Sequence, residues 1–216
     1  MDPVLKIQAT AELVAREFAD FLLEKSQQND RLTIALSGGS TPALLFDILS
    51  KDYRDRIDWD KLHFYWGDER CVPPDHEESN YKMTLDRFLL HVPVPQGNIL
   101  RVLGEENPEM ESLRYAEEIK ENLDPGPIFD IMILGMGTDG HTASIFPHQM
   151  ELLTANTLCA VAKHPESGQL RITLTGNVIN SARNICFLVT GASKSEKVRE
   201  IMNKQPAADS YPASHI

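Results

Sequence analysis

The spacing of apolar residues along the chain follows two periods, and each period predicts one kind of element. After Thr10, apolar residues recur every third or fourth position up to Leu22, which predicts an amphipathic helix with Thr10 as its N-cap. Thr41 and Pro42 predict the start of a second helix, with Thr41 as N-cap and Pro42 in the first helical position. Further helices are predicted over residues 80–90, 109–123 and 193–203. Short runs rich in β-forming residues predict strands over residues 32–36, 62–66, 129–134, 158–163, 171–175 and 184–190, of which 129–134 and 184–190 are expected to be buried.

Strands that alternate with helices in this way are typical of the α/β class with a largely parallel sheet. We therefore expect one domain over residues 1–216, built on a Rossmann-like open, mostly parallel twisted sheet with helices on both faces. The strands around Ser167–Gly168 are expected to pair as a hairpin. Ligands of such sheets bind beyond the carboxyl ends of the strands. The functional site is therefore expected among the loops 37–42, 67–73, 135–147 and 190–194.

Composition and charge narrow the choice of partner. The 216 residues are 42% hydrophobic and 25% charged, which are ordinary globular values, and 32 acidic against 21 basic residues give a formal net charge of −11. A chain with this charge repels nucleic acids and anionic membranes, so neither is expected as a partner. An anionic small molecule stays possible if a few basic residues converge. We expect a monomer or a homodimer.

Compartment signals are consistent with the cytoplasm. Residues 1–6 lack the charged and then apolar layout of a signal peptide, and no apolar stretch approaches the ~18 residues of a membrane span. The three cysteines, Cys71, Cys159 and Cys186, are far apart and form no CxxC pair, which favours a reducing compartment.

The loop Ser37-Gly38-Gly39-Ser40-Thr41-Pro42 joins a predicted strand to a predicted helix. Gly38 and Gly39 allow a ligand to approach the backbone, Ser40 and Thr41 add hydroxyl groups, and the N–H groups at a helix start attract anions such as phosphate. The P-loop pattern is absent, because no Lys follows the second glycine. On this loop alone, a capped turn and an anion site explain the residues equally well.

The segment Gly135-Met136-Gly137-Thr138-Asp139-Gly140 matches the GxGxxG pattern, yet we do not expect it to bind a dinucleotide. It follows a late strand, no acidic residue ends a strand ~20 positions later, and His141 stands where a small residue is needed. The sequence Asp139-Gly140-His141 instead favours a histidine general base oriented by a carboxylate. A purely structural histidine is the alternative. The other histidines show no metal-ligand spacing, so a metal site is not expected.

Three basic residues are candidates for the local cluster that an anionic substrate requires. Arg70 ends the polar run Gly67-Asp68-Glu69-Arg70, and its guanidinium is suited to bidentate contact with a phosphate or carboxylate. Arg171 starts a predicted strand, and Lys194 starts the last predicted helix. Each residue taken alone is more often a surface side chain, but all three lie at predicted strand ends.

Together these loops resemble the 6-phosphogluconolactonase family, which shares a superfamily with glucosamine-6-phosphate deaminases. The resemblance rests on residues 36–42, 66–73 (WGDERCVP), Ser79-Asn80-Tyr81, 135–147, 171–175 and Lys194, and it extends over nearly the whole chain. It implies hydrolysis, without metal or cofactor, of a phosphorylated sugar lactone, 6-phospho-D-glucono-1,5-lactone, to 6-phosphogluconate in the oxidative pentose phosphate pathway.

The resemblance also implies a role for each candidate residue. His141 would activate the water that attacks the lactone carbonyl, Arg70 would stabilise the anionic intermediate or hold the substrate, and Asp139 would orient the site. The substrate, and its phosphate above all, would be bound by Gly38, Gly39, Ser40, Thr41, Asp68, Arg171 and Lys194. A δ-lactone is a reactive ester, so one positioned base worth ~10²–10⁴-fold is sufficient chemistry. Ser144 lacks the G-x-S-x-G context of a nucleophile.

Two alternatives stay open. A deaminase or isomerase of the same superfamily is disfavoured by Phe146, where those enzymes have a Glu, and by Arg70, where they have a Tyr. A non-catalytic sugar-phosphate-binding protein is disfavoured by the presence of both His141 and Arg70. Family members also continue beyond Pro212-Ala213-Ser214 into a strand with Trp and Asp, whereas this sequence stops at Ile216. We therefore expect either a truncated sequence or a member that ends early.

Overall fold

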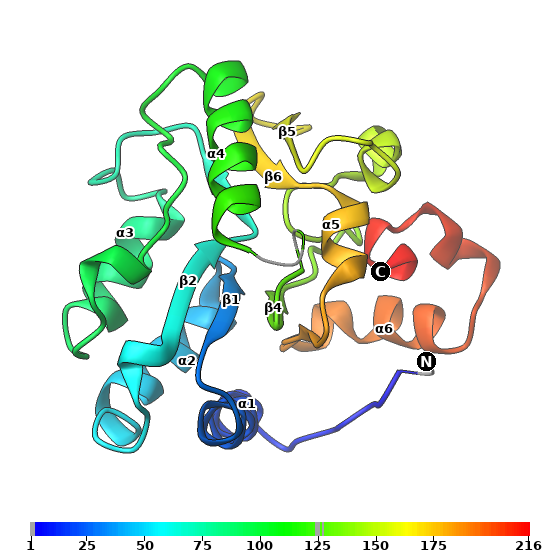
Figure 1. Cartoon of the computed structure of the whole chain (residues 1–216). Coiled ribbons are helices and arrows are strands. Elements are labelled where there is room, and N and C mark those ends of the chain that lie inside the picture. The colour runs from blue at the N-terminus through cyan, green and yellow to red at the C-terminus, as the bar shows by residue number, and fades with distance from the viewer. Residues whose placement is uncertain (1–2, 124–125, 127) are drawn as a thin grey trace.

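The centre of the molecule is a parallel four-stranded sheet with the order β2-β1-β4-β7 (Figure 1). The computed structural model describes residues 3–123, 126 and 128–216. The strands are Leu32–Leu36 (β1), Leu62–Trp66 (β2), Ile131–Leu134 (β4) and Ile185–Phe187 (β7). Every residue of β1 and β4 is buried, which explains why these strands are continuously apolar instead of alternating. The α/β class and the mostly parallel sheet that were expected from the sequence are confirmed.

A second sheet lies beside the first and has the order β3-β6-β5. Cys159–Lys163 (β5) and Leu170–Leu174 (β6) form the expected antiparallel hairpin. The third strand, Asp68–Arg70 (β3), pairs antiparallel with β6. The expectation that residues 67–70 form a polar loop is therefore wrong for 68–70. The backbone of this polar run finds its partners on β6, and that pairing overrides the turn-like composition.

Among the described residues, six α-helices surround the sheets: Ala11–Gln28 (α1), Ser40–Asp52 (α2), Asn80–Thr84 (α3), Pro108–Asn122 (α4), Gly176–Ser181 (α5) and Ser195–Met202 (α6). A π-helical turn, Leu85–Leu89, continues α3, and short 3-10 turns lie at Trp59–Lys61, Gln96–Asn98, Pro147–Leu153, Ala192–Lys194, Pro206–Ser210 and Pro212–His215. Helix α1 packs against α2, and α4 packs against β5 and β6, as Figure 1 shows. No helix among the described residues is long and apolar enough to span a bilayer.

The starts of two helices show where the sequence prediction was right and where it was wrong. Thr10 caps α1 as expected, since its hydroxyl oxygen accepts a hydrogen bond from the Leu13 N–H at 3.2 Å. Helix α2, in contrast, begins at Ser40 after Gly39, so Thr41 is not its N-cap. The Thr41 hydroxyl instead forms a 2.7 Å hydrogen bond with the hydroxyl of Thr190, which follows β7. This long-range contact ties the start of α2 to the loop after β7.

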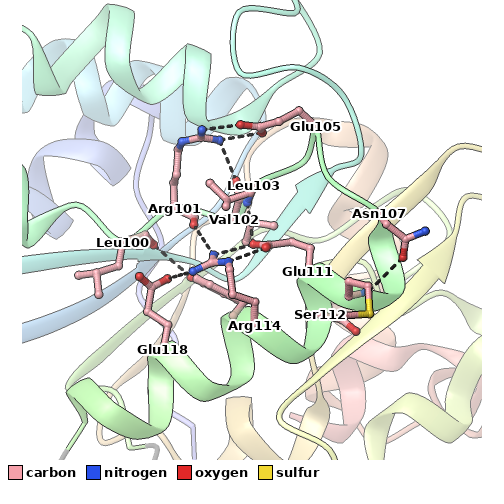
Figure 2. A network of polar contacts seen from close by, with 12 residues as sticks. Leu100, Arg101, Val102, Leu103, Glu105, Asn107, Glu111, Ser112, Arg114 and Glu118 are labelled. Atoms are coloured by element: carbon pink, nitrogen blue, oxygen red, sulfur yellow. Dashed lines mark hydrogen bonds and ion pairs between the residues drawn. The ribbon is translucent and has the colours of Figure 1, made fainter.

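A partly buried ionic network, centred on the buried Glu111, fastens α4 to the segment that precedes it (Figure 2). The guanidinium of Arg114 donates to both carboxylate oxygens of Glu111 at 2.5 and 2.6 Å, to Glu118 at 2.9 Å, and to the carbonyl oxygen of Arg101 at 3.2 Å. Glu111 also accepts the backbone N–H of Leu103 at 2.7 Å. Because a buried carboxylate is costly unless it is paired, this network stabilises one packing of α4 against the sheets.

Candidate active site

An open cavity of about 670 Å³ lies at the carboxyl ends of β1, β2 and β4, where the sequence placed the site. Every substrate-binding candidate lines it: Gly38, Gly39, Ser40, Thr41, Asp68, Arg171 and Lys194. His141 and Arg70 line it as well. Asp139 does not line the cavity and lies behind His141. Segments more than 150 residues apart in the chain therefore meet around one space, as expected for an α/β sheet.

His141 is oriented by Asp139 through a direct hydrogen bond. The distance from His141 Nδ1 to Asp139 Oδ1 is 2.6 Å, and the same oxygen accepts the backbone N–H of His141 at 3.1 Å. A carboxylate only accepts, so Nδ1 carries the proton, and the neutral imidazole presents the lone pair of Nε2. Nε2 has no hydrogen-bond partner among the residues that the structure describes. This arrangement is that of a general base with its orienting acid.

The charge of Asp139 is secured by its partner. Burial raises the pKa of Asp139, but the hydrogen bond and the charge of His141 outweigh burial, and the pKa falls from 3.8 to about 2. Asp139 is therefore a carboxylate throughout the neutral range. The negative charge of Asp139, held beside Nδ1, stabilises the imidazolium that forms when Nε2 takes a proton.

Glycines make this close arrangement possible, and the segment does not build a dinucleotide site. After Gly140, which has a φ of +87°, the chain forms a bridge between Thr142 and Ile145 and a 3-10 turn from Pro147 to Leu153, with no helix to receive a pyrophosphate. The expectation that the GxGxxG match is not a nucleotide motif agrees with this geometry.

Gly137 lies directly against the base and its partner, so we expect Gly137→Ala to displace them. A Cβ at residue 137 would overlap the ring of His141 and Oδ1 of Asp139, and even a displacement of ~1 Å costs about 10²-fold in rate. The measurement is kcat for the lactone that the sequence resemblance implies, with the thermal unfolding midpoint measured to show that the variant is folded. Gly97→Ala is the matched control, because a Cβ there meets nothing within 4 Å. Full activity of the residue 137 variant would show that the pair does not need its present position.

Arg70 and Arg171 are brought together by strand register. They lie directly opposite each other on β3 and β6, and the alternation along β3 turns Asp68 and Arg70 toward the cavity and Glu69 away from it. Two like charges on directly opposed residues are unfavourable unless an anion lies between them. Burial lowers the pKa of Arg171, and the charge of Arg70 adds to this shift while Asp68 opposes it.

The two guanidinium groups keep unused donors. Arg70 donates to the carbonyl oxygen of Glu78, and Arg171 lies 4.0 Å from Asp68 and 5.8 Å from the ring centroid of Phe146. The Nε atoms of both arginines are buried without a hydrogen-bond partner in the described part of the chain. Buried cations with free N–H groups are suited to a phosphate or a developing oxyanion.

Asp68 is buried at the floor of the cavity with a defined orientation. Its Oδ2 accepts the hydroxyl of Ser144 at 2.7 Å, and the backbone N–H of Ser144 donates to the Thr173 hydroxyl at 3.2 Å. Ser144 is fully buried, so its hydroxyl serves Asp68 and is not placed as a nucleophile. The loop after β4 is thereby attached to both β3 and β6.

Lys194 forms no ion pair with any described residue and lines the cavity at the start of α6. Ser40 and Thr41 are the first two residues of α2, so the cavity also receives the amino end of a 13-residue helix. Sequence reasoning did not select several other lining residues as site residues: Ser37, Pro42, Asn80, Met136, Ala143 and Leu188. All of these except Leu188 lie within the segments that carry the family resemblance, and Ala143 has a φ of +47°.

A second cavity, of about 490 Å³, lies at the opposite, amino ends of the strands. Its arginines already have partners: Arg31 donates to the carbonyl oxygen of Asn122 at 2.9 Å, and Arg183 is paired with Asp130. No cluster of three or more His, Cys, Asp or Glu side chains in the described ranges is arranged to hold a metal ion. The chemistry therefore concentrates in the cavity around His141.

The fold and this site define a sugar-phosphate enzyme of the α/β class, and comparison with known proteins gives the family. Residues 6–216 match the family model described as glucosamine-6-phosphate isomerases/6-phosphogluconolactonase. The chain belongs to this family.

Individual relatives are consistent with the family. The 6-phosphogluconolactonase of Haemophilus influenzae is 45% identical over 210 residues, which are 97% of this chain and 88% of the relative. The crystal structure of devB protein superposes with a TM-score of 0.92 at 44% identity, covering 97% of this chain and 89% of that one. The 6-phosphogluconolactonase from Thermotoga maritima gives a TM-score of 0.85 at 28% identity, covering 99% and 93%.

Proposed function

We propose that this enzyme hydrolyses 6-phospho-D-glucono-1,5-lactone to 6-phosphogluconate, with His141 as the general base. The observation that carries the proposal is the Asp139–His141 pair facing a cavity that also holds Arg70, Arg171 and Lys194. The names of the relatives at 40–45% identity support the reaction. The geometry supports the roles of the residues.

The reaction needs one proton acceptor that later becomes a donor. Nε2 of His141 removes a proton from water, and the water oxygen forms a bond to the lactone carbonyl carbon. The resulting oxyanion is stabilised by Arg70. The intermediate collapses when the bond between this carbon and the ring oxygen breaks, and the imidazolium returns its proton to that oxygen. Asp139 keeps the imidazole in the required tautomer and stabilises its cation.

The phosphate end is bound by the opposite part of the cavity in this proposal. Arg171 and Lys194 supply charge, Ser40 and Thr41 supply the amino end of α2, and Gly38 and Gly39 let the backbone approach the ligand. Asp68 contacts a polar group of the sugar. No metal or cofactor takes part in these steps.

The residue packed against His141 disfavours the deaminase alternative. Phe146 is fully buried, and its ring centroid lies 4.8 Å from that of His141, so the residue before Pro147 offers an apolar ring and no carboxylate.

A paired assay distinguishes lactone hydrolysis from deamination. Freshly generated lactone, with spontaneous hydrolysis subtracted, is expected to be consumed, and glucosamine 6-phosphate is expected to release no ammonia. Ammonia release without lactone turnover would contradict the proposal.

Lys194→Ala is expected to weaken binding more than catalysis. A charge-assisted hydrogen bond contributes about 1.5–3 kcal/mol, so KM rises about 10- to 100-fold while kcat stays within about threefold. Initial rates over a range of lactone concentrations measure both constants. Lys197→Ala is the control, because that ammonium lies over the Tyr211 ring at 3.9 Å and does not line the cavity. An unchanged KM for the residue 194 variant would remove Lys194 from the phosphate site.

We also propose that the enzyme acts in the cytoplasm as one domain, as a monomer or a homodimer, without nucleic acid or membrane partners. The three cysteines are unpaired, and burial raises the pKa of Cys71 and Cys186 to about 11 and that of Cys159 to about 12. Such thiols are unreactive and suit a reducing compartment. The net charge of −11 supports a small diffusible substrate.

A further inference from the structure

We propose that Asn80 determines substrate specificity, by accepting a hydrogen bond from a sugar hydroxyl with its carboxamide oxygen. This inference rests on the proposed function and adds a contact to the sugar ring. Asn80 is the first residue of α3, is 2% exposed, and lines the cavity.

The orientation of the carboxamide is set by its neighbour. Nδ2 of Asn80 donates to the backbone carbonyl oxygen of Asp68 at 2.9 Å. Because a carbonyl oxygen only accepts, the NH₂ group must face Asp68, and Oδ1 points the other way. Oδ1 reaches Gly38 so closely that a Cβ on that glycine would overlap it. Among the described residues, Oδ1 has no hydrogen-bond partner.

A buried carboxylate holds Asn80 in place. Glu69, on the face of β3 turned away from the cavity, accepts the backbone N–H groups of Asn80 at 2.8 Å and Tyr81 at 2.7 Å and the Ser79 hydroxyl at 3.1 Å. The carbonyl oxygen of Asn80 accepts the hydroxyl of Thr84 at 2.8 Å. A side chain fixed in this way loses little freedom when a ligand binds, which is what a selective contact requires.

The chemistry of the cavity leaves a need for an acceptor. Arg70, Arg171 and Lys194 are donors only, so they can bind a phosphate or an oxyanion but cannot accept the proton of a hydroxyl group. Asp68 uses Oδ2 for Ser144 and Arg171, which leaves its Oδ1 as a charged acceptor for the polar group of the sugar assigned to it above. Oδ1 of Asn80 is a neutral acceptor without a partner, and it lies beside the Gly38–Gly39 backbone. A polyhydroxylated substrate satisfies this atom, and a substrate that lacks the hydroxyl leaves it buried and unpaired.

The test compares kcat/KM for 6-phosphogluconolactone with kcat/KM for its 2-deoxy, 3-deoxy and 4-deoxy analogues. The wild-type enzyme is expected to reject one analogue by about 10-fold or more, the cost of leaving a buried acceptor unpaired. In Asn80→Ala, the ratio of kcat/KM for the full lactone to kcat/KM for that analogue is expected to fall to within about threefold of unity, because the acceptor has been removed. This ratio distinguishes a contact with the substrate hydroxyl from a purely structural role of Asn80, since a structural effect lowers kcat/KM equally for every lactone.

Two further variants complete the experiment. Asn184→Ala is the matched control: its Nδ2 donates to the backbone carbonyl oxygen of Asp130 at 2.9 Å, the same type of contact away from the cavity, and its ratios are expected to equal those of the wild type. Asn80→Ser is used if Asn80→Ala does not fold. Equal acceptance of all analogues by the wild type, or a ratio that persists without Asn80, overturns the inference. Failure of the wild type to hydrolyse any lactone is a different result, which overturns the proposed function and this inference with it.

Discussion

Replacement of His141 by alanine is expected to lower kcat about 10²- to 10⁴-fold, the range for loss of a positioned general base. His141 lines the cavity with the Asp139 carboxylate at Nδ1, and alanine in its place has no group to take the proton from water. KM is expected to change little, because the proposed phosphate contacts come from other elements. Steady-state rates, with spontaneous lactone hydrolysis subtracted, measure the effect.

His148→Ala is the control for this experiment. His148 is exposed and does not line the cavity. Its ring stacks on that of Phe146, with the two centroids 5.9 Å apart. Its turnover is expected to match the wild type. Near-normal kcat in the residue 141 variant, with a correctly folded protein, would remove the general-base role from His141 and require another group to activate the water.

Replacement of Asp139 by asparagine is expected to lower kcat by about 10²- to 10⁴-fold while the fold is kept. The carboxamide has nearly the same shape, but its NH₂ group donates to Nδ1, so the imidazole proton moves to Nε2 and the lone pair that faces the cavity is lost. The double variant Asp139→Asn/His141→Ala is expected to be no slower than His141→Ala alone, because the two residues act as one unit. Additive losses would show that Asp139 acts independently of the histidine.

The pH dependence follows from the low pKa of Asp139. Since that pKa is about 2, Asp139 stays ionised above pH 4, and its protonation is not expected to lower the activity between pH 8 and pH 4. The pKa of the carboxylate is lowered on folding, so its contribution to stability is present above its ordinary pKa of 3.8 and is lost as the pH falls toward 2. Rate and thermal-unfolding profiles over this range measure the two effects separately.

The elements with strong local signals were predictable from the sequence. Strands β1 and β2 occupy the predicted ranges without change, because both are short, largely buried runs rich in apolar residues. The Asp139–His141 pair was also predictable, since two residues separated by one glycine meet within a single turn. Local spacing was sufficient in both cases because the partners are close in the chain.

Only the tertiary structure decided the contacts between distant segments. Residues 68–70 form a strand because β6 lies beside them, and that register places Arg70 opposite Arg171. The Thr41 hydroxyl meets Thr190, 149 residues away, so it does not cap α2. Asn80 reaches the cavity because Glu69 holds the start of α3 from behind. The sequence by itself determined the fold class, the catalytic turn and the presence of basic residues at strand ends. Which of them face one another was decided by strand pairing and buried hydrogen bonds, because these join residues whose proximity no local pattern encodes.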